Sequence, residues 1–193
     1  MSTPVGPAHI GLLGGSFDPP HLGHVLLGAA ALSQASIDAL WVLPVFRHPH
    51  GKAFTADFEH RLRMCELAFG VLQHVQLMDL EKQHAGPSYT VHTVDALRLR
   101  YPTQRWSLIM GQDAYAQRHR WHEAERLFAM VSPWVVGREG AESKATDAIV
   151  HTLSLPDISS TSIRKALRTQ SAKADAFLSA PVRDYIQSHG LYR

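Results

Sequence analysis

The feature that most constrains the fold is a regular alternation of short apolar runs with segments of helical periodicity. Runs with the length of buried strands cover 9–15, 39–45, 74–80, 106–111 and 130–137, and a shorter sixth run covers 148–155. Helical spacing is found over 22–34, 57–70, 90–101, 121–129, 159–168 and 181–188. Near-continuous apolar strands separated by helices are typical of a parallel sheet buried on both faces. The sequence therefore predicts an α/β fold, a doubly wound parallel sheet with helices on both faces and a small C-terminal helical segment.

A chain of 193 residues with 45% hydrophobic content can bury a substantial core. We expect a single domain over 1–193, with its C-terminal helical part over about 156–193. The formal net charge of +2 is too small to indicate a nucleic-acid or membrane-surface partner. Cys65 is the one cysteine of the sequence, which excludes an intramolecular disulfide and a cysteine-based zinc site. With neither a signal peptide nor an apolar membrane span in the sequence, we expect a cytoplasmic protein, and the sequence leaves a homo-oligomer open.

The turn after the first expected strand, GGSFDPPHLGH over 14–24, combines glycines, prolines and two histidines. Ligands of open parallel sheets bind beyond the carboxyl ends of the strands, so this turn is a favoured place for chemistry. Gly14 and Gly15 permit either a close approach by a ligand or a positive φ. His21 and His24 lie at the expected helix start, where free N–H groups and the helix dipole attract an anion. The pattern indicates a phosphate site, with a merely structural tight turn as the alternative.

The HxxH spacing by itself is weak evidence. Thirteen histidines in 193 residues produce such pairs by chance, and His119 with His122 forms a second pair, which we expect on the surface. The sequence contains no Walker, GxGxxG, GxSxG or HExxH motif, so other common phosphate, hydrolase and metal sites are not indicated. Any metal is expected to be Mg²⁺ carried on the substrate phosphates.

A second hydroxyl-rich helix start follows near the end of the chain, in ISSTSIR over 158–164. Ser160 and Thr161 offer hydroxyl groups, and Arg164 adds positive charge one turn into the helix. Alone, this pattern is more typical of an ordinary Ser-capped surface helix. Together with the first turn it favours a site for a triphosphate.

These two segments resemble the two signatures of the HxGH nucleotidyltransferases, with His21, Gly23 and His24 matching the histidine–glycine–histidine pattern. Within that superfamily the chain is most similar to the bacterial nicotinate-nucleotide adenylyltransferases. The supporting segments span nearly the whole chain: GPSYTVHT (86–93), MGQDAYAQRHRW (110–121), WVVGREG (134–140) and YIQSHGLYR (185–193). The resemblance implies a Rossmann-like fold and transfer of AMP from ATP to nicotinate mononucleotide in NAD biosynthesis, with release of pyrophosphate.

The resemblance also implies roles for particular residues. Catalysis would depend on His24, His21 and Arg164. ATP, with its Mg²⁺, would contact Gly14, Gly15, Ser16, Phe17, His21, Gly23, His24, Gly111, Asp113, Ser160, Thr161 and Arg164. The mononucleotide would contact Ser16, His50, Lys52, Tyr89, Thr90 and Trp121, with Trp121 stacked on the pyridine ring.

Structural alternatives remain open for several of these residues. Asp113 could be a helix N-cap, Trp121 could be a core residue, and Ser88 with Thr90 could cap the helix that follows. The stretch VFRHPHGK (45–52) departs from the NNxPPHK-like loop that members usually carry after the second strand. Two other functions also remain open: the same transfer to another acceptor, such as nicotinamide mononucleotide or pantetheine phosphate, and a sensor that binds ATP or NAD without turnover.

Overall fold

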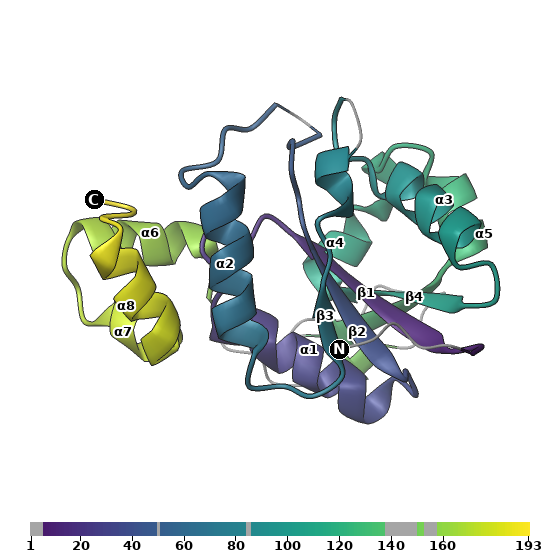
Figure 1. The fold of residues 1–193 in the computed structure, drawn as a ribbon, viewed down its shortest axis with the longest axis horizontal. Helices are drawn as coiled ribbons and strands as arrows, with labels where there is room; N and C mark the ends of the chain where they lie inside the picture. Colours follow the sequence, from purple (N-terminus) through teal and green to yellow (C-terminus); the bar gives the residue numbers. More distant parts are fainter. Residues whose placement is uncertain (1–5, 50, 84–85, 138–149, 153–157) are drawn as a thin grey trace.

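The computed structural model describes residues 6–49, 51–83, 86–137, 150–152 and 158–193, and six parallel strands form its central sheet (Figure 1). The strands are β1 (His9–Gly15), β2 (Ala39–Pro44), β3 (Val75–Leu77), β4 (Arg105–Gly111), β5 (Ser132–Gly137) and β6 (Val150–Thr152). Their order across the sheet is β3-β2-β1-β4-β5-β6, and each neighbouring pair is parallel. This is the doubly wound order, so the predicted fold class is confirmed.

Helices cover both faces of the sheet because successive strand residues face opposite sides. Leu13 belongs to the core formed with α1 (Leu22–Gln34) and α2 (Phe58–Phe69). Its neighbour Leu12 belongs to the core on the other face, formed with α3 (Thr90–Arg100), α4 (Gln112–Ala116) and α5 (Ala124–Met130). Two short 3₁₀ turns are also present: η1 (Leu80–Gln83), which adds Leu80 to this second core, and η2 (Arg118–Arg120), which follows α4.

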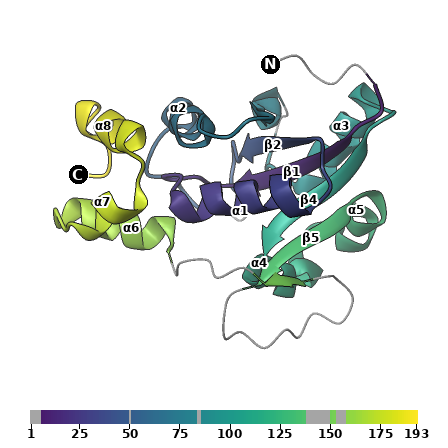
Figure 2. The same ribbon diagram turned by 90° about the horizontal axis from the view of Figure 1, so that it is seen from below.

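The C-terminal helices lie together at one end of the molecule, beside α2 (Figures 1 and 2). They are α6 (Ser160–Arg168), α7 (Lys173–Phe177) and α8 (Ala180–Ser188). Val182 and Ile186 of α8 are buried in the same core cluster as Phe69 of α2. The C-terminal helices therefore extend the hydrophobic layer that α1 and α2 place on the sheet.

Several predicted boundaries are wrong. The helix expected over 121–129 begins only at Ala124, because Glu123 has a left-handed backbone with φ of 49°. The strand expected over 74–80 pairs only over Val75–Leu77, and the chain then turns into η1. Of the run 148–155, residues 150–152 form β6 and the others lie outside the described residues. The helices α4 and α7 and the two 3₁₀ turns are too short to show a detectable period.

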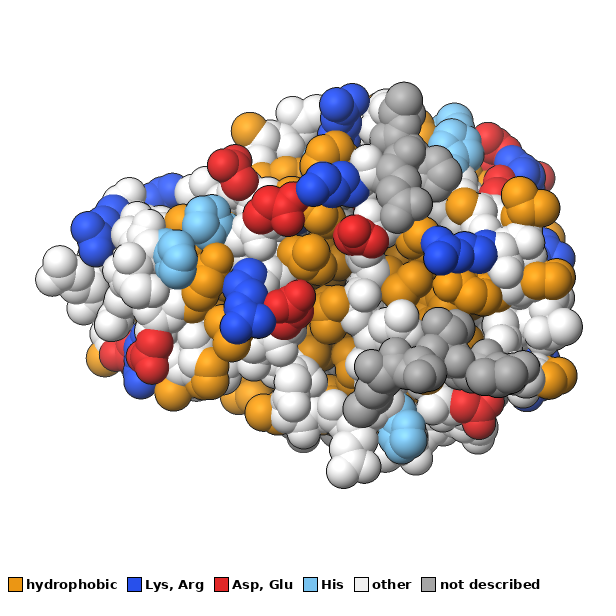
Figure 3. Space-filling model, in the orientation of Figure 1, with side chains coloured by type: hydrophobic (Ala, Val, Ile, Leu, Met, Phe, Trp, Pro, Cys, Tyr) orange, Lys and Arg blue, Asp and Glu red, His pale blue; other side chains and the backbone are white. Residues whose placement is uncertain are grey.

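The topology places a crevice where the chain changes direction across the sheet. From β3 the chain returns to β4, on the other side of β1, so the carboxyl ends of β1 and β4 lie next to each other with their following segments diverging. On the face shown in Figure 3, Lys and Arg side chains are interspersed with Asp and Glu rather than gathered into a basic patch. No helix in the described ranges is long and apolar enough to span a membrane.

Candidate active site

Two neighbouring cavities contain the predicted site residues. The larger of the two, of about 530 Å³, opens at the carboxyl ends of β1 and β4. One wall comes from the turn after β1 and the start of α1, and the opposite wall comes from the start of α3 and the segment after α4. The predicted site residues that line it are Gly14, Gly15, Ser16, His24, Tyr89, Thr90, Gly111 and Trp121. The cavity therefore brings together groups that the sequence resemblance assigned to both substrates.

A second cavity, of about 260 Å³, shares Ser16 and His24 with the first. Its other predicted residues are Phe17, Lys52, Ser160, Thr161 and Arg164. The start of α1, which carries His24, thus meets the start of α6, which carries Ser160 and Thr161. These two helix starts are more than a hundred residues apart in the sequence. This second cavity has positive charge from Lys52 and Arg164 and hydroxyl groups from α6.

Direct hydrogen bonds hold the two helix starts against each other. The Ser160 hydroxyl donates to the carbonyl of Pro19 at 2.9 Å, and the Arg164 guanidinium donates to the carbonyl of Asp18 at 2.6 Å. Arg164 also donates to the Thr161 hydroxyl at 3.2 Å. The start of α6 itself is capped as predicted, with the Ser159 hydroxyl accepting from the backbone N–H of Ser162.

The glycines of the first turn provide space rather than unusual backbone angles. A Cβ on Gly14 would meet no atom within 4 Å, whereas one on Gly15 would lie 2.9 Å from the Phe17 ring. The left-handed residue of this turn is Phe17, with φ of 46°, and both glycines lie in β1. The expectation of a positive φ at Gly14 or Gly15 is therefore wrong, and that of a close approach remains.

His21 and His24 form a packed pair at the start of α1. His21 is the N-cap residue, and its backbone N–H donates to Nδ1 of His24 at 3.2 Å. The two ring centroids are 3.8 Å apart, and Phe17 contacts His24 edge-on at 4.9 Å. A Cβ on Gly23 would lie 3.2 Å from the His21 ring, so glycine leaves room for this pair.

Burial keeps both imidazoles neutral near pH 7. It lowers the pKa of His21 to about 4. Burial, with a smaller contribution from the nearby His21, also lowers the pKa of His24 well below its ordinary value. His24 lines both cavities, whereas His21 lies behind it, and Nδ1 of His21 is buried without a hydrogen-bond partner. An anion in the second cavity would therefore meet His24 first.

The segment before α3 forms the opposite wall of the larger cavity. Ser88 is joined to the loop after β2, because its N–H donates to the carbonyl of Arg47 at 2.9 Å and its hydroxyl accepts from the Arg47 N–H at 3.1 Å. Tyr89, not Ser88 or Thr90, occupies the N-cap position of α3, so the capping interpretation of those two residues is wrong. Thr90 is the first residue of the helix, where backbone N–H groups lack intrahelical acceptors.

Three further predicted residues have different outcomes. Asp113 is exposed in the first turn of α4, outside the lining of both cavities, and Gly111 rather than Asp113 is the N-cap residue. Trp121 is half-buried and packs near Phe128, so it contacts the core and lines the cavity at once. His50 lies outside the described residues.

Sequence reasoning missed the buried carboxyl of Glu81, which lines the larger cavity. It accepts from the backbone N–H of Phe46 at 3.1 Å and from the Thr93 hydroxyl at 3.4 Å. Burial raises the pKa of Glu81, and hydrogen bonds, the strongest from Ser88, partly offset that effect. It directly follows the strand expected over 74–80, and nothing in its spacing distinguishes it from a surface glutamate.

Comparison with known proteins now assigns the family. The sequence matches the model of the cytidylyltransferase-like family over residues 12–166. A protein of Anaeromyxobacter dehalogenans (strain 2CP-1), named "Probable nicotinate-nucleotide adenylyltransferase", is 37% identical over 191 residues, covering 97% of this chain and 98% of its own length. This chain belongs to the nicotinate-nucleotide adenylyltransferase family. A Bacillus pumilus member is 35% identical over 186 residues, with 95% and 97% of the two chains covered.

Solved structures agree in fold with this nicotinate-nucleotide adenylyltransferase family member. The Plasmodium falciparum nicotinic acid mononucleotide adenylyltransferase complexed with NaAD has a TM-score of 0.80 and 21% identity, covering 96% of this chain and 97% of its own. The same enzyme complexed with APC gives a TM-score of 0.79. The predicted resemblance and the enzyme class, nucleotidyltransferase, are confirmed.

Proposed function

We propose that this enzyme transfers AMP from Mg²⁺-bound ATP to nicotinate mononucleotide, forming nicotinate adenine dinucleotide and pyrophosphate in NAD biosynthesis. The observation that supports it most is the meeting of the two helix starts, with His24 facing both cavities. One cavity has the cationic and hydroxyl groups for a triphosphate, and the other has the aromatic wall for a pyridine ring. The names of the relatives support the choice of acceptor.

The reaction needs alignment more than acid–base chemistry. An oxygen of the mononucleotide phosphate, already anionic at neutral pH, attacks the α-phosphorus of ATP, and the bond to the bridging oxygen of pyrophosphate breaks. The protein's contribution is to hold the two phosphates in line and to stabilise charge as it moves to the leaving group. His24 would donate from its imidazole to the α-phosphate, supported by the N-terminus of α1.

The second cavity would hold the β- and γ-phosphates. Arg164, Ser160 and Thr161 would donate to their oxygens, with Lys52 at the rim. Hydrogen bonds to charged groups contribute about 1.5–3 kcal/mol each. His21, packed behind His24, would act by orienting it.

Mg²⁺ would enter this site on the ATP phosphates. Asp18 is the one carboxylate among the residues lining the second cavity. Its oxygens already accept from the backbone N–H groups of Thr55 and Ala56 and from the Tyr192 hydroxyl. A carboxylate so fully hydrogen-bonded suits a structural role, which supports binding of the ion through substrate oxygens and water.

The larger cavity would hold the nicotinate end of the mononucleotide. Trp121 would stack on the pyridine ring, and the ring's carboxylate would accept from N–H groups in the first turn of α3, at Thr90. The N–H of Tyr89 already donates to the carbonyl of Pro87, so Tyr89 would contribute its ring and hydroxyl.

The test is pyrophosphate release by the purified enzyme with ATP and Mg²⁺, comparing nicotinate mononucleotide, nicotinamide mononucleotide and pantetheine phosphate. We expect turnover with the first at a kcat/KM well above the other two. Preference for another acceptor would overturn the substrate and keep the transfer reaction. ATP binding without turnover on any of the three would favour the sensor instead.

A further inference from the structure

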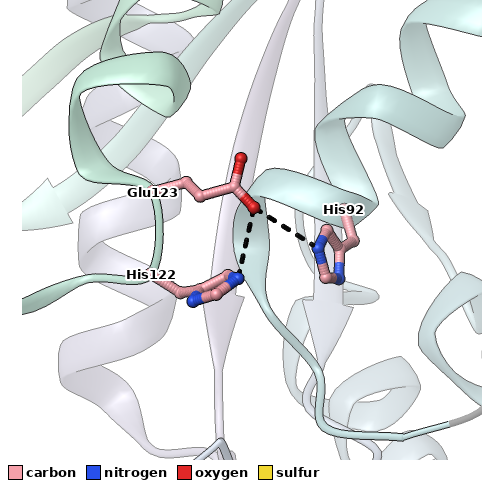
Figure 4. Close-up of side chains that lie close together, drawn as sticks. All are labelled: His92, His122 and Glu123. Carbon is pink, nitrogen blue, oxygen red and sulfur yellow. Dashed lines mark ion pairs between the residues drawn. The ribbon is translucent and has the colours of Figure 1, made fainter.

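Three side chains that the proposed reaction does not use lie close together (Figure 4), and one of them, His122, lines the larger cavity. His92 comes from the first turn of α3, and His122 and Glu123 come from the segment between η2 and α5. Nε2 of His122 lies 3.2 Å, and Nε2 of His92 3.9 Å, from Oε1 of Glu123. One ligand atom from each of the three residues lies within 4.8 Å of the other two.

These three atoms are all electron-pair donors when each imidazole is neutral and carries its proton on Nδ1. An imidazole with its proton on Nδ1 presents a lone pair at Nε2, and a carboxylate oxygen presents only lone pairs. Such atoms repel one another unless positive charge lies between them, supplied either by protons on the histidines or by a metal ion. Two imidazoles and one carboxylate form a ligand set that Zn²⁺ and neighbouring transition metals bind well.

The surrounding residues hold these donors in place. The Arg126 guanidinium donates to Oε2 of Glu123 at 2.7 Å and to Asp95 at 2.6 Å, which leaves Oε1 facing the histidines. Groups that orient metal ligands in this manner are usual around metal sites.

The His122 ring is also fixed, by stacking. Its centroid lies 4.1 Å from that of Tyr89, with an angle of 25° between the two planes. Tyr89 in turn contacts the His92 ring edge-on at 5.6 Å. The donors are 39–49% exposed, so water can complete the coordination of an ion without rearrangement of the backbone.

We propose that His92, His122 and Glu123 bind one divalent transition-metal ion of the Zn²⁺ class. Small side-chain rotations bring the donors to the bond lengths that such an ion requires, about 2.0–2.2 Å to nitrogen and carboxylate oxygen. Mg²⁺ prefers oxygen ligands and is not the expected occupant. The ion would link the start of α3 to the segment that carries Trp121, the two parts of one wall of the larger cavity.

The test is a Zn²⁺ titration of tag-free, chelator-treated full-length enzyme, in competition with a chromogenic chelator and without any nucleotide. We expect one tight site per chain, and at least a tenfold weaker Kd for His92→Gln and Glu123→Gln, since even a group that only orients a ligand contributes about 10–100-fold to affinity. His119→Gln is the matched control, because His119 is an exposed histidine of the same HxxH pair outside the cluster. Equal Kd values for the wild type and His92→Gln would overturn the proposal.

A second measurement keeps the result independent of folding defects. Saturating Zn²⁺ should raise the Tm of the wild type and of His119→Gln, and leave that of His92→Gln unchanged, because a ligand stabilises only the folded state that binds it. Millimolar Mg²⁺ should not displace the Zn²⁺; displacement would overturn the transition-metal assignment. Since the titration contains no substrate, its outcome does not depend on the proposed adenylyl transfer.

Discussion

At the scale of the residue, the site depends on a histidine pair that is kept neutral by burial. His21 and His24 stack at the start of α1, where the helix dipole disfavours a positive charge. Their lowered pKa values mean that neither ring carries a stable charge before an anion arrives. A negatively charged phosphate beside His24 would raise the pKa of that ring, so binding would strengthen the hydrogen-bond donor that we propose for the reaction.

We expect His24→Ala to reduce kcat about 100- to 1,000-fold, the usual consequence of removing one preorganised donor to a developing charge. ATP affinity should change far less, because Arg164 and the hydroxyls of α6 remain in the second cavity. Pyrophosphate release measures kcat, and calorimetric titration with ATP measures binding. His119→Ala serves as the control and should retain wild-type kcat. Unchanged turnover in His24→Ala would remove this residue from the mechanism.

The buried His21 also predicts how stability depends on pH. Its pKa falls from the ordinary 6.5 in the unfolded chain to about 4 in the folded protein. Between these values the unfolded state binds a proton that the folded state does not, so stability is present above pH 6.5 and is lost as pH falls. From pH 7.5 to pH 4.5 this one group should cost about 2 kcal/mol of unfolding free energy.

His21→Asn tests this dependence, because asparagine is a favourable N-cap that does not titrate in this range. Urea denaturation at both pH values should show the wild type losing about 2 kcal/mol more than His21→Asn. His119→Asn should behave like the wild type, since that exposed histidine has no comparable burial. Parallel losses in the wild type and His21→Asn would contradict a buried neutral His21.

The sequence pointed to candidate site residues that form a local motif. It did not point to residues whose hydrogen-bond partners are far away in the sequence. His21, Gly23 and His24 were recognisable because a helix start and a glycine turn are coded within a few positions. Glu81 and Arg61 were not, because their functions depend on backbone carbonyls and N–H groups supplied by other segments. Burial of a charged side chain is a tertiary property that no spacing reveals.

At the scale of the element, the loops around the site are joined by one buried guanidinium. Arg61 of α2 is 1% exposed and donates to the carbonyls of Ser16 at 2.9 Å, Val45 at 2.8 Å and Ala56 at 3.1 Å. These carbonyls belong to the turn after β1, the loop after β2 and the segment before α2. The Phe54 ring lies 3.8 Å from the guanidinium carbon and covers it. Arg61 therefore fixes the spacing between the turn after β1 and the loop after β2.

We expect Arg61→Met to reduce the unfolding free energy by about 3 kcal/mol, because it leaves buried carbonyls without donors. It should also lower kcat/KM, since Ser16 borders both cavities. Arg63→Met is the matched control: Arg63 is exposed on the same helix and pairs with Glu66, a contact worth at most about 0.5 kcal/mol. Urea denaturation and pyrophosphate release measure the two effects. Similar losses in both variants would refute the distinction.

Helices and strands were predictable where the hydrophobic pattern extended over many residues. The start of α5 was not, because the side chains before it line the cavity. The five main strands and α1, α2 and α3 agree with the predicted runs to within a few residues. The segment 121–129 has helical spacing throughout, yet Trp121 and His122 line the cavity and the helix starts only at Ala124. Tertiary contacts override periodicity at that point.

At the scale of the whole molecule, the end of the chain is tied to the first turn. The Tyr192 hydroxyl donates to Oδ1 of Asp18 at 2.7 Å in a buried position, and burial raises the pKa of this phenol, so it stays protonated. The other carboxylate contacts of Asp18 hold Thr55 and Ala56, and its carbonyl holds Arg164. The segment before α2, the helix α6 and the C-terminal Tyr192 thus all contact one residue of the β1–α1 turn.

This convergence predicts that a change at Tyr192 alters the second cavity, where we propose that the triphosphate binds. Tyr192→Phe keeps the buried ring and removes only the hydroxyl, so it should cost about 1.5–3 kcal/mol of unfolding free energy, the contribution of a hydrogen bond to a charged group. It should also raise KM for ATP more than KM for the mononucleotide, because Asp18 positions Arg164 rather than the aromatic wall. Tyr185→Phe is the control, since the Tyr185 hydroxyl contacts His60 at a part-buried position away from both cavities. A KM for ATP that moves equally in both variants, or in neither, would show that the C-terminal contact stabilises the fold without shaping the site.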